Sequence, residues 1–168
     1  MKYIRVKIIF ILFLFITGSG FSQKKQKLPD IDLRDLNSKI VNTSSFNNQA
    51  KPIILTFWAT WCKPCIRELS AYNENYEEWK KNTGVKIIAV SIDDIRSKNK
   101  VAPYVRGRDW DFEVYLDSNE DLKRAMNINT VPHTFLINGS GEIVWQHNSF
   151  AEGDEEKLYE RILAISKK

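Results

Sequence analysis

Cysteine and histidine are both scarce in this chain of 168 residues, which contains two of each. The histidines, His133 and His147, lie far along the chain from the cysteines, Cys62 and Cys65. A zinc site needs about four ligands close together, so no metal centre is predicted. Covalent haem attachment requires a histidine directly after the second cysteine, where the sequence has Ile66. A haem anchor is therefore excluded.

A strong excess of charge of one sign is also missing. The net charge of +4 is concentrated at the start of the chain, because the first 22 residues hold three of the 25 basic residues and no acidic one. The remaining residues carry 22 basic against 21 acidic groups. Without a basic face there is no reason to expect nucleic acid as a partner.

Long apolar runs are absent as well. The longest, at residues 8–16, has nine members, whereas a membrane-spanning helix needs roughly 20. A basic segment precedes this run, and the small residues Gly20 and Ser22 follow it. This order is typical of a signal peptide over residues 1–22, cleaved on export. An uncleaved membrane anchor that also uses residues 17–21 is the alternative, and no cysteine lies near residue 20 for a lipoprotein anchor.

Export places the mature chain in a periplasm or a comparable extracytoplasmic space, where cysteines can form disulfides. The polar residues 23–27 are then interpreted as a short tether, and residues 28–168 as one domain. After cleavage we expect no stable membrane span.

The domain has the pattern of an α/β protein. Continuous apolar runs at 52–58 and 85–92 predict two buried parallel strands, joined by a helix over about 64–80. That helix is predicted from apolar residues three or four apart: Ile66, Leu69, Tyr72, Tyr76 and Trp79. A weak hairpin is expected at 28–46, a helix at 96–106, a strand at 112–117 and a short helix at 119–126. A clear hairpin at 133–137 and 142–147 and a final helix from 154 complete the pattern.

The cysteine pair lies at the junction between the first predicted buried strand and the helix that follows it. Pro64 suits the first turn of a helix, which places Cys62 at the helix N-terminus. Free backbone N–H groups and the positive end of the helix dipole then favour the thiolate of Cys62, and Lys63 adds a positive charge beside it. Cys65 lies one turn further on the same face, close enough to form a disulfide.

Two alternative roles for the cysteine pair fit the sequence less well. A structural disulfide with this spacing closes a very small loop and stabilises the fold little. A peroxidase of the peroxiredoxin type needs a proline seven residues before its reactive cysteine, where this chain has Leu55. A Cys-x-x-Cys motif beside a strand–helix–strand unit indicates redox chemistry.

The stretch "FWATWCKPC" resembles the active site of the thioredoxin superfamily. Residues 28–165 are similar to the TlpA/ResA-like branch of exported thiol–disulfide oxidoreductases, through "LPDIDLRDLNSKIV", "ILTFWATWC", "KIIAVSID", "VYLD" and "TVPHTFLINGSGEIV". The resemblance implies a thioredoxin-like fold: a mixed central sheet flanked by helices, with an N-terminal β-hairpin. It also implies a strand–helix insertion at 94–126.

The resemblance further implies a two-step exchange in which Cys62 attacks a partner's disulfide and Cys65 releases the partner. Trp61 and Pro64 are expected to shape the site. Val131 and Pro132 match the family's cis-proline loop, which packs opposite the cysteines and binds an extended peptide; from the residues alone a trans proline would be expected. No cofactor beyond the redox-active disulfide is implied.

Two acidic positions of the family concern the protons of the cysteines. ResA-like members have an acid at the place of Glu68, where it can tune the cysteines, whereas the residues alone fit a solvated glutamate on an amphipathic helix equally well. Thioredoxins have a buried aspartate six residues before the first cysteine, where this chain has Thr56. That proton relay is absent, so the exchange must use Glu68, water or another group.

His133 departs from the family as well, because a small or hydroxylated residue usually follows the proline. Its imidazole can adjust the local charge near neutral pH, but a surface histidine at the start of a strand is the favoured interpretation.

The sequence thus predicts an exported oxidoreductase that exchanges disulfides with protein partners and receives electrons from a thiol donor. Reduction is the role that the family implies, including reduction of apocytochrome c before haem attachment. The alternative is a non-catalytic thioredoxin-like module that binds a peptide or chaperones a partner.

Overall fold

The computed structural model describes residues 26–166, in which seven strands form one mixed sheet in the order β2-β1-β5-β4-β3-β6-β7. The strands are β1 (Asp32–Asp35), β2 (Ile40–Asn42), β3 (Ile53–Trp58), β4 (Lys86–Ser91), β5 (Glu113–Leu116), β6 (His133–Ile137) and β7 (Ile143–Asn148). This arrangement confirms the predicted mixed sheet and α/β class.

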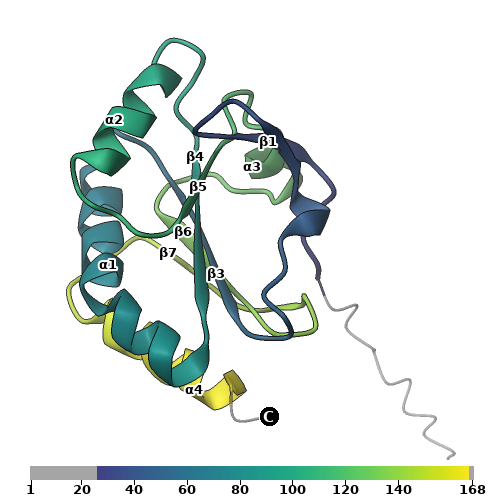
Figure 1. Cartoon of the computed structure of the whole chain (residues 1–168), viewed down its shortest axis with the longest axis vertical. Coiled ribbons are helices and arrows are strands. Elements are labelled where there is room, and N and C mark those ends of the chain that lie inside the picture. Colours follow the sequence, from purple (N-terminus) through teal and green to yellow (C-terminus); the bar gives the residue numbers. More distant parts are fainter. Residues whose placement is uncertain (1–25, 167–168) are drawn as a thin grey trace, which may run out of the picture.

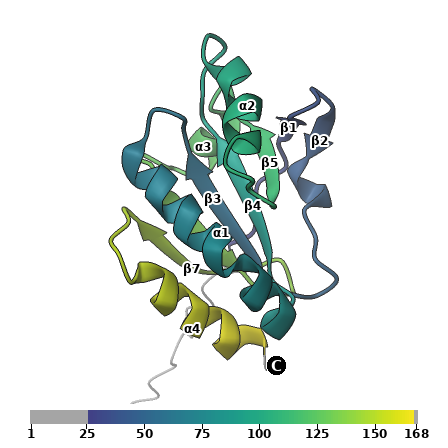
Figure 2. The same cartoon turned by 60° about the vertical axis from the view of Figure 1, so that its left-hand side comes forward.

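Helices cover the sheet on both sides. The α-helices are α1 (Lys63–Thr83), α2 (Val101–Arg106), α3 (Asp121–Ala125) and α4 (Asp154–Ser166), and two 3-10 turns are η1 (Thr43–Ser45) and η2 (Lys98–Lys100). Figures 1 and 2 show α1, α2 and α4 on one side of the sheet, with α3 on the other. The start of α1 and the whole of α2 lie toward the same end of the molecule.

The two central strands carry the core. Every residue of β3 is buried, as are five of the six in β4, which explains why both segments are continuous apolar runs. β3 and β4 are parallel, as predicted, and α1 connects them. β6 pairs antiparallel with β3 on its other side, so that β3, which leads to the cysteines, lies between β4 and β6.

The periodic apolar residues of α1 face the sheet and α4. Tyr72, Tyr76 and Trp79 are all buried, and the indole of Trp79 stacks on the ring of Tyr159 from α4 with centroids 5.5 Å apart. The helix ends where Gly84 adopts a left-handed conformation (φ 69°) and its N–H bonds the Lys80 carbonyl. α1 is therefore longer than the predicted 64–80 by a turn.

The expected N-terminal hairpin is present, and β1 joins it to the main sheet through β5. The insertion between β4 and β6 supplies β5, which runs parallel to β4, together with α2 and α3. The helix predicted at 96–106 is split, because residues 98–100 form a 3-10 turn before α2. The Asp94 side chain accepts the N–H groups of Arg96 and Ser97 and so holds this region as a turn.

The tether prediction is wrong for its last two residues. The carbonyl of Gln26 accepts the N–H of Ile143 at 2.8 Å, and Lys27 forms an antiparallel bridge with Glu142. These residues therefore extend the sheet beside β7. The remainder of the proposed tether and the proposed signal peptide at 1–22 lie outside the described residues. Between residues 26 and 166, none of the helices has both the length and the apolar character that crossing a bilayer requires.

Candidate active site

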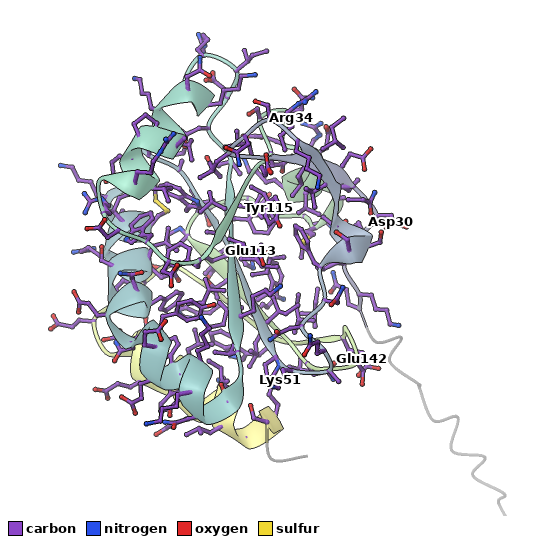
Figure 3. The ribbon with its side chains drawn as sticks, in the orientation of Figure 1. Asp30, Arg34, Lys51, Glu113, Tyr115 and Glu142 are labelled. Atoms are coloured by element: carbon purple, nitrogen blue, oxygen red, sulfur yellow. A yellow bond between two sulfur atoms is a disulfide. The ribbon has the colours of Figure 1, made fainter. Side chains whose placement is uncertain are left out.

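Cys62 and Cys65 form a disulfide at the start of α1, with an S–S bond of 2.02 Å and Cα atoms 5.3 Å apart. Figure 3 shows this bond in yellow beside the first turn of the helix. Cys62 is the N-cap residue, and its sulfur accepts the backbone N–H of Cys65 at 3.3 Å. The local geometry is thus the one that the strand-to-helix pattern predicts.

The two sulfurs differ in their access to a partner. Cys62 keeps 5% of its surface exposed, whereas Cys65 is completely buried. An incoming thiol or disulfide therefore meets Cys62 first. The N-terminus of α1 presents the Cys65 N–H and the positive end of the helix dipole to the Cys62 sulfur, which stabilises a negative charge there.

A buried aspartate fixes the loop that leads to Cys62. The Asp93 carboxylate accepts the Thr60 N–H at 2.8 Å, the Thr60 hydroxyl at 2.6 Å and the Ser91 hydroxyl at 2.8 Å. Because β3 and β4 are parallel, the loops that follow them meet at one edge of the sheet, and Asp93 ties them together. Asp93 was not identified from the sequence, where its only signal is a charged residue soon after a buried strand.

The Val131–Pro132 peptide bond is cis, as the family resemblance implies. The Val131 carbonyl oxygen lies 3.7 Å from the Cys62 sulfur, although 69 residues separate them in sequence. Pro132 is buried and precedes β6, which pairs with β3. The register between these strands therefore brings the proline loop to the disulfide.

The remaining residues predicted beside the pair differ in exposure. Trp61 is 64% exposed and is among the most exposed large apolar side chains of the described chain. Lys63 is exposed and Pro64 half-buried in the first turn of α1. Trp61 is consequently free to contact a partner that reaches Cys62.

Glu68 is buried, with 1% of its surface exposed, so the solvated-glutamate interpretation is wrong. Its carboxyl lies within hydrogen-bond distance of the hydroxyl groups of Thr56 (2.9 Å), Thr134 (2.9 Å) and Tyr72 (3.1 Å). Burial raises the pKa of Glu68 from the ordinary 4.5 to about 7, because burial penalises the charged form more than the hydroxyl groups favour it. The carboxyl is thus poised to gain or lose a proton near neutral pH.

Thr56 and Thr134 lie directly opposite each other in the β3–β6 ladder and are completely buried. Thr56 is not an acid and so does not replace the aspartate of thioredoxins. Its hydroxyl instead contacts the carboxyl of Glu68, which comes from α1. Burial and the neighbouring Glu68 raise the pKa of Tyr72 well above its ordinary value, so Tyr72 remains a hydroxyl donor. Thr134 and Tyr72 were not identified from the sequence as site residues, because each fits a structural strand or helix position.

His133 is half-buried at the start of β6, as the surface-histidine interpretation favours. Its ring stacks on Phe135 with centroids 4.6 Å apart, and Nε2 lies 3.2 Å from the Gln146 side-chain oxygen. Burial lowers the pKa of His133, which favours the neutral imidazole. The structure thus gives His133 packing contacts on the strand.

Within residues 26–166 no group of three or more His, Cys, Asp or Glu side chains is placed to hold a metal ion. The site instead combines a disulfide at a helix N-terminus with a buried carboxyl one turn further along the same helix. A disulfide stores two oxidising equivalents, and a carboxyl that titrates near neutral pH can exchange the proton that thiol chemistry requires.

Comparison with known proteins gives consistent matches. The sequence profile of the AhpC/TSA family matches residues 25–146. The thiol–disulfide oxidoreductase ResA of Bacillus cereus is 30% identical over an alignment of 181 positions that covers 99% of each chain. ResA of Bacillus subtilis is 34% identical over 116 residues, or 69% of this chain and 62% of that protein.

Solved structures share the fold. An uncharacterized thioredoxin-like protein of Porphyromonas gingivalis is 44% identical, with a TM-score of 0.75 over 83% of this chain and 92% of that one. A protein of Chlorobium tepidum described as a putative thiol:disulfide interchange protein DsbE is 27% identical, with a TM-score of 0.73 over 84% and 96% of the two chains. These likenesses confirm the predicted thioredoxin-like fold.

Proposed function

The chain belongs to the AhpC/TSA family of thioredoxin-like proteins and is a thiol–disulfide oxidoreductase, and we propose that it reduces disulfides of partner proteins outside the cytoplasm. The observation that carries this proposal is the Cys62–Cys65 disulfide, whose more accessible sulfur caps α1. The sequence-derived roles of Cys62, Cys65 and Glu68 are part of the proposal.

In the first step the reduced protein uses Cys62. Its thiolate attacks one sulfur of the partner's disulfide, a Cys62–partner disulfide forms, and the other partner sulfur leaves as a thiolate that takes a proton from water. The helix N-terminus supports the attacking thiolate through the backbone N–H of Cys65, which donates to its sulfur, and through the positive end of the helix dipole. The exposed Trp61, which precedes Cys62 in the chain, and the Val131 carbonyl, 3.7 Å from the Cys62 sulfur, are proposed to contact the partner's backbone and side chains.

In the second step Cys65 releases the partner. Its thiol loses a proton and attacks the Cys62 sulfur, so that the Cys62–Cys65 disulfide forms and the second partner sulfur leaves as a thiolate. Two electrons have then passed from the dithiol to the partner. Glu68 lies one turn from Cys65 on the same helix and titrates near neutral pH, so we assign to it the proton that Cys65 gives up.

Insulin reduction tests the proposal. Cys62→Ser should abolish turnover with dithiothreitol as electron donor, because the only other thiol of the chain, Cys65, is completely buried. Glu74→Gln, an exposed change on the same helix, is the matched control and should retain the wild-type rate. Activity unaffected by Cys62→Ser would instead support the non-catalytic binding module. Titration of the wild-type pair against glutathione then gives its reduction potential and its direction.

Export is a proposal that rests on the sequence. The basic start, the nine-residue apolar run and the small residues at 20 and 22 support a cleaved signal peptide. The mass of the mature protein tests it, since cleavage after residue 22 gives a chain that begins at Gln23. A full-length chain found in the membrane fraction would support the uncleaved anchor.

Apocytochrome c is the partner that we propose on the family resemblance. A peptide that contains an oxidised Cys-x-x-Cys-His segment provides the direct test. The reduced protein should convert this peptide to its dithiol in a single turnover, measured by mass spectrometry after acid quenching. A peptide that the protein leaves oxidised, while insulin is reduced, would remove apocytochrome c from the proposal and leave the general reductase.

A further inference from the structure

The carboxyl of Glu68 and the hydroxyl groups of Thr56 and Thr134 form a closed ring of three buried hydrogen-bond contacts. The Glu68 Oε1 atom lies 2.9 Å from the Thr134 hydroxyl, this hydroxyl lies 2.9 Å from that of Thr56, and the Thr56 hydroxyl lies 2.9 Å from Glu68 Oε2. Each of the three residues has at most 1% of its surface exposed. The ring joins three segments of the chain: β3, β6 and α1.

The number of hydrogen atoms in this ring depends on the charge of Glu68. Each of the three contacts needs one hydrogen, and each threonine hydroxyl supplies one. The third must be the proton of the carboxyl itself. When Glu68 is ionised, both threonines donate to it and the contact between the two hydroxyl oxygens has no hydrogen.

We propose that Thr56 and Thr134 are positioning residues that store a proton on Glu68 in the disulfide form of the protein. In the protonated state Glu68 donates to Thr134, Thr134 donates to Thr56, and Thr56 donates to the other carboxyl oxygen. In the ionised state the Thr134 hydroxyl turns to Glu68. The carboxyl therefore takes up or gives back a proton by rotation of one hydroxyl group, without movement of a heavier atom.

The inference rests on the proposed function, in which Cys65 passes its proton to Glu68. That transfer leaves Cys65 in the disulfide and Glu68 neutral. A closed ring is the arrangement that a neutral Glu68 needs, and it is found here in the oxidised protein. Reduction by a thiol donor returns the proton from Glu68 to Cys65 and opens the ring again.

Three more side chains lie near the ring without closing any of its three contacts: Tyr72, Asp154 and His147. The Tyr72 hydroxyl donates to Oε1 from the same helix in either charge state. Asp154, at the start of α4, repels the ionised carboxylate and is held by Lys157. His147 on β7 lies opposite Thr134 and 3.5 Å from Asp154. Tyr72 therefore serves as a comparison for the ring members.

Thr134→Val and Tyr72→Phe should shift the Glu68 pKa differently. Removing Tyr72's hydroxyl costs the neutral form one ordinary bond and the ionised form one charge-assisted bond, so the pKa should rise by about 0.5–1 unit. Removing Thr134's hydroxyl costs the neutral form two ring bonds and the ionised form one charge-assisted bond. These losses nearly cancel, because charge-assisted bonds are about twice as strong, and the shift should stay within about 0.3 unit. The measurement is a ¹³C NMR titration of the Glu68 side-chain carboxyl in the oxidised protein.

A double-mutant cycle gives a second readout that does not need the titration. At pH 5 Thr56→Val and Thr134→Val should be non-additive in their urea midpoints, because either change removes the contact between the two hydroxyls. At pH 9, where Glu68 is ionised, the same two changes should be additive. Thr134→Ser keeps the hydroxyl and should restore the wild-type behaviour, and Thr83→Val, at a buried threonine outside the ring, should show no pH-dependent coupling to Thr56→Val.

The outcomes separate the ring from the proposed function. A larger pKa shift for Thr134→Val than for Tyr72→Phe, or equal coupling at pH 5 and pH 9, would overturn the ring. If the valine variants do not fold, isotope-edited infrared spectra of the wild-type oxidised protein decide, since an ionised Glu68 at pH 6 also overturns it. Failure of the proposed function would be seen in a different measurement. In that case Glu68→Gln would leave the rate of partner release unchanged, whatever the titrations show.

Discussion

Replacement of Glu68 by glutamine should remove the pH dependence that this carboxyl gives to stability. The pKa of Glu68 is 4.5 in an unperturbed chain and about 7 in the folded protein. Below pH 4.5 the carboxyl is neutral in both states. Between pH 4.5 and 7 the unfolded chain loses the proton while the folded protein keeps it, so the free energy of unfolding falls as the pH rises.

The size of this effect follows from the shift. Each unit of pKa difference corresponds to about 1.4 kcal/mol, so a rise from 4.5 to about 7 removes roughly 3 kcal/mol of stability between pH 4.5 and pH 8. No allowance for solvent screening is needed, because the residue is 1% exposed. In Glu68→Gln the amide stays neutral and can both accept from Tyr72 and donate to a threonine hydroxyl, so this loss should disappear.

The assay is urea unfolding of the oxidised proteins at pH 5 and pH 8. The stability of Glu68→Gln relative to wild type should increase by about 2.5 kcal/mol between these pH values, since the unfolded chain has already lost part of its protons at pH 5, and the denaturant slopes should not change. Glu74→Gln, on the exposed face of the same helix, is the control and should show no such trend. A difference between Glu68→Gln and wild type that stays constant with pH would refute the argument, since it would mean that Glu68 titrates alike in both states.

Three further changes test the rest of the site. Asp93→Ala should destabilise the protein by about 3 kcal/mol in urea unfolding, because it leaves the Thr60 N–H and hydroxyl without their buried acceptor. Trp61→Ala should change stability by less than about 0.5 kcal/mol, since the side chain is 64% exposed, while raising KM for insulin about fivefold. Cys65→Ser should lower insulin turnover by at least about tenfold and accumulate a covalent Cys62–partner complex, visible on non-reducing gels.

Each change has a control that isolates its cause. Asp111→Ala, at an exposed aspartate, should leave the urea midpoint within about 0.5 kcal/mol of wild type. Val144→Ala, at an exposed apolar residue on β7, should leave KM unchanged. The Cys62→Ser, Cys65→Ser double variant should form no covalent complex. Equal effects of Asp93→Ala and Asp111→Ala, or an unchanged KM for Trp61→Ala, would contradict the respective assignment.

Much of the fold was predictable because its signals are local. β3 and β4 are continuous apolar runs since both faces of each strand are covered, and the periodic aromatic residues of α1 mark the face that meets the sheet and α4. Pro64 and the change from strand to helix pattern placed Cys62 at the helix N-terminus. The cis form of Val131–Pro132 was expected from the family resemblance alone, because sequence statistics favour a trans bond.

The chemistry around Glu68 was only partly predictable. Glu68 occupies a position on the apolar face of α1, between Cys65 and Tyr72, and this spacing could have indicated burial. Nothing in the sequence shows that Thr56 and Thr134 meet there, because their contact depends on the register between β3 and β6. The same holds for Asp93, whose partner Thr60 belongs to a different loop.

The order of residues alone therefore determined which segments are strands and helices and where the redox pair stands along the chain. Periodicity and helix-start preferences act over a few residues and can be followed along a single chain. Which groups surround the buried carboxyl was decided by tertiary structure, since strand register and helix packing bring together residues up to 78 positions apart. Burial and hydrogen bonding, and with them the proton affinity of Glu68, exist only once those segments have met.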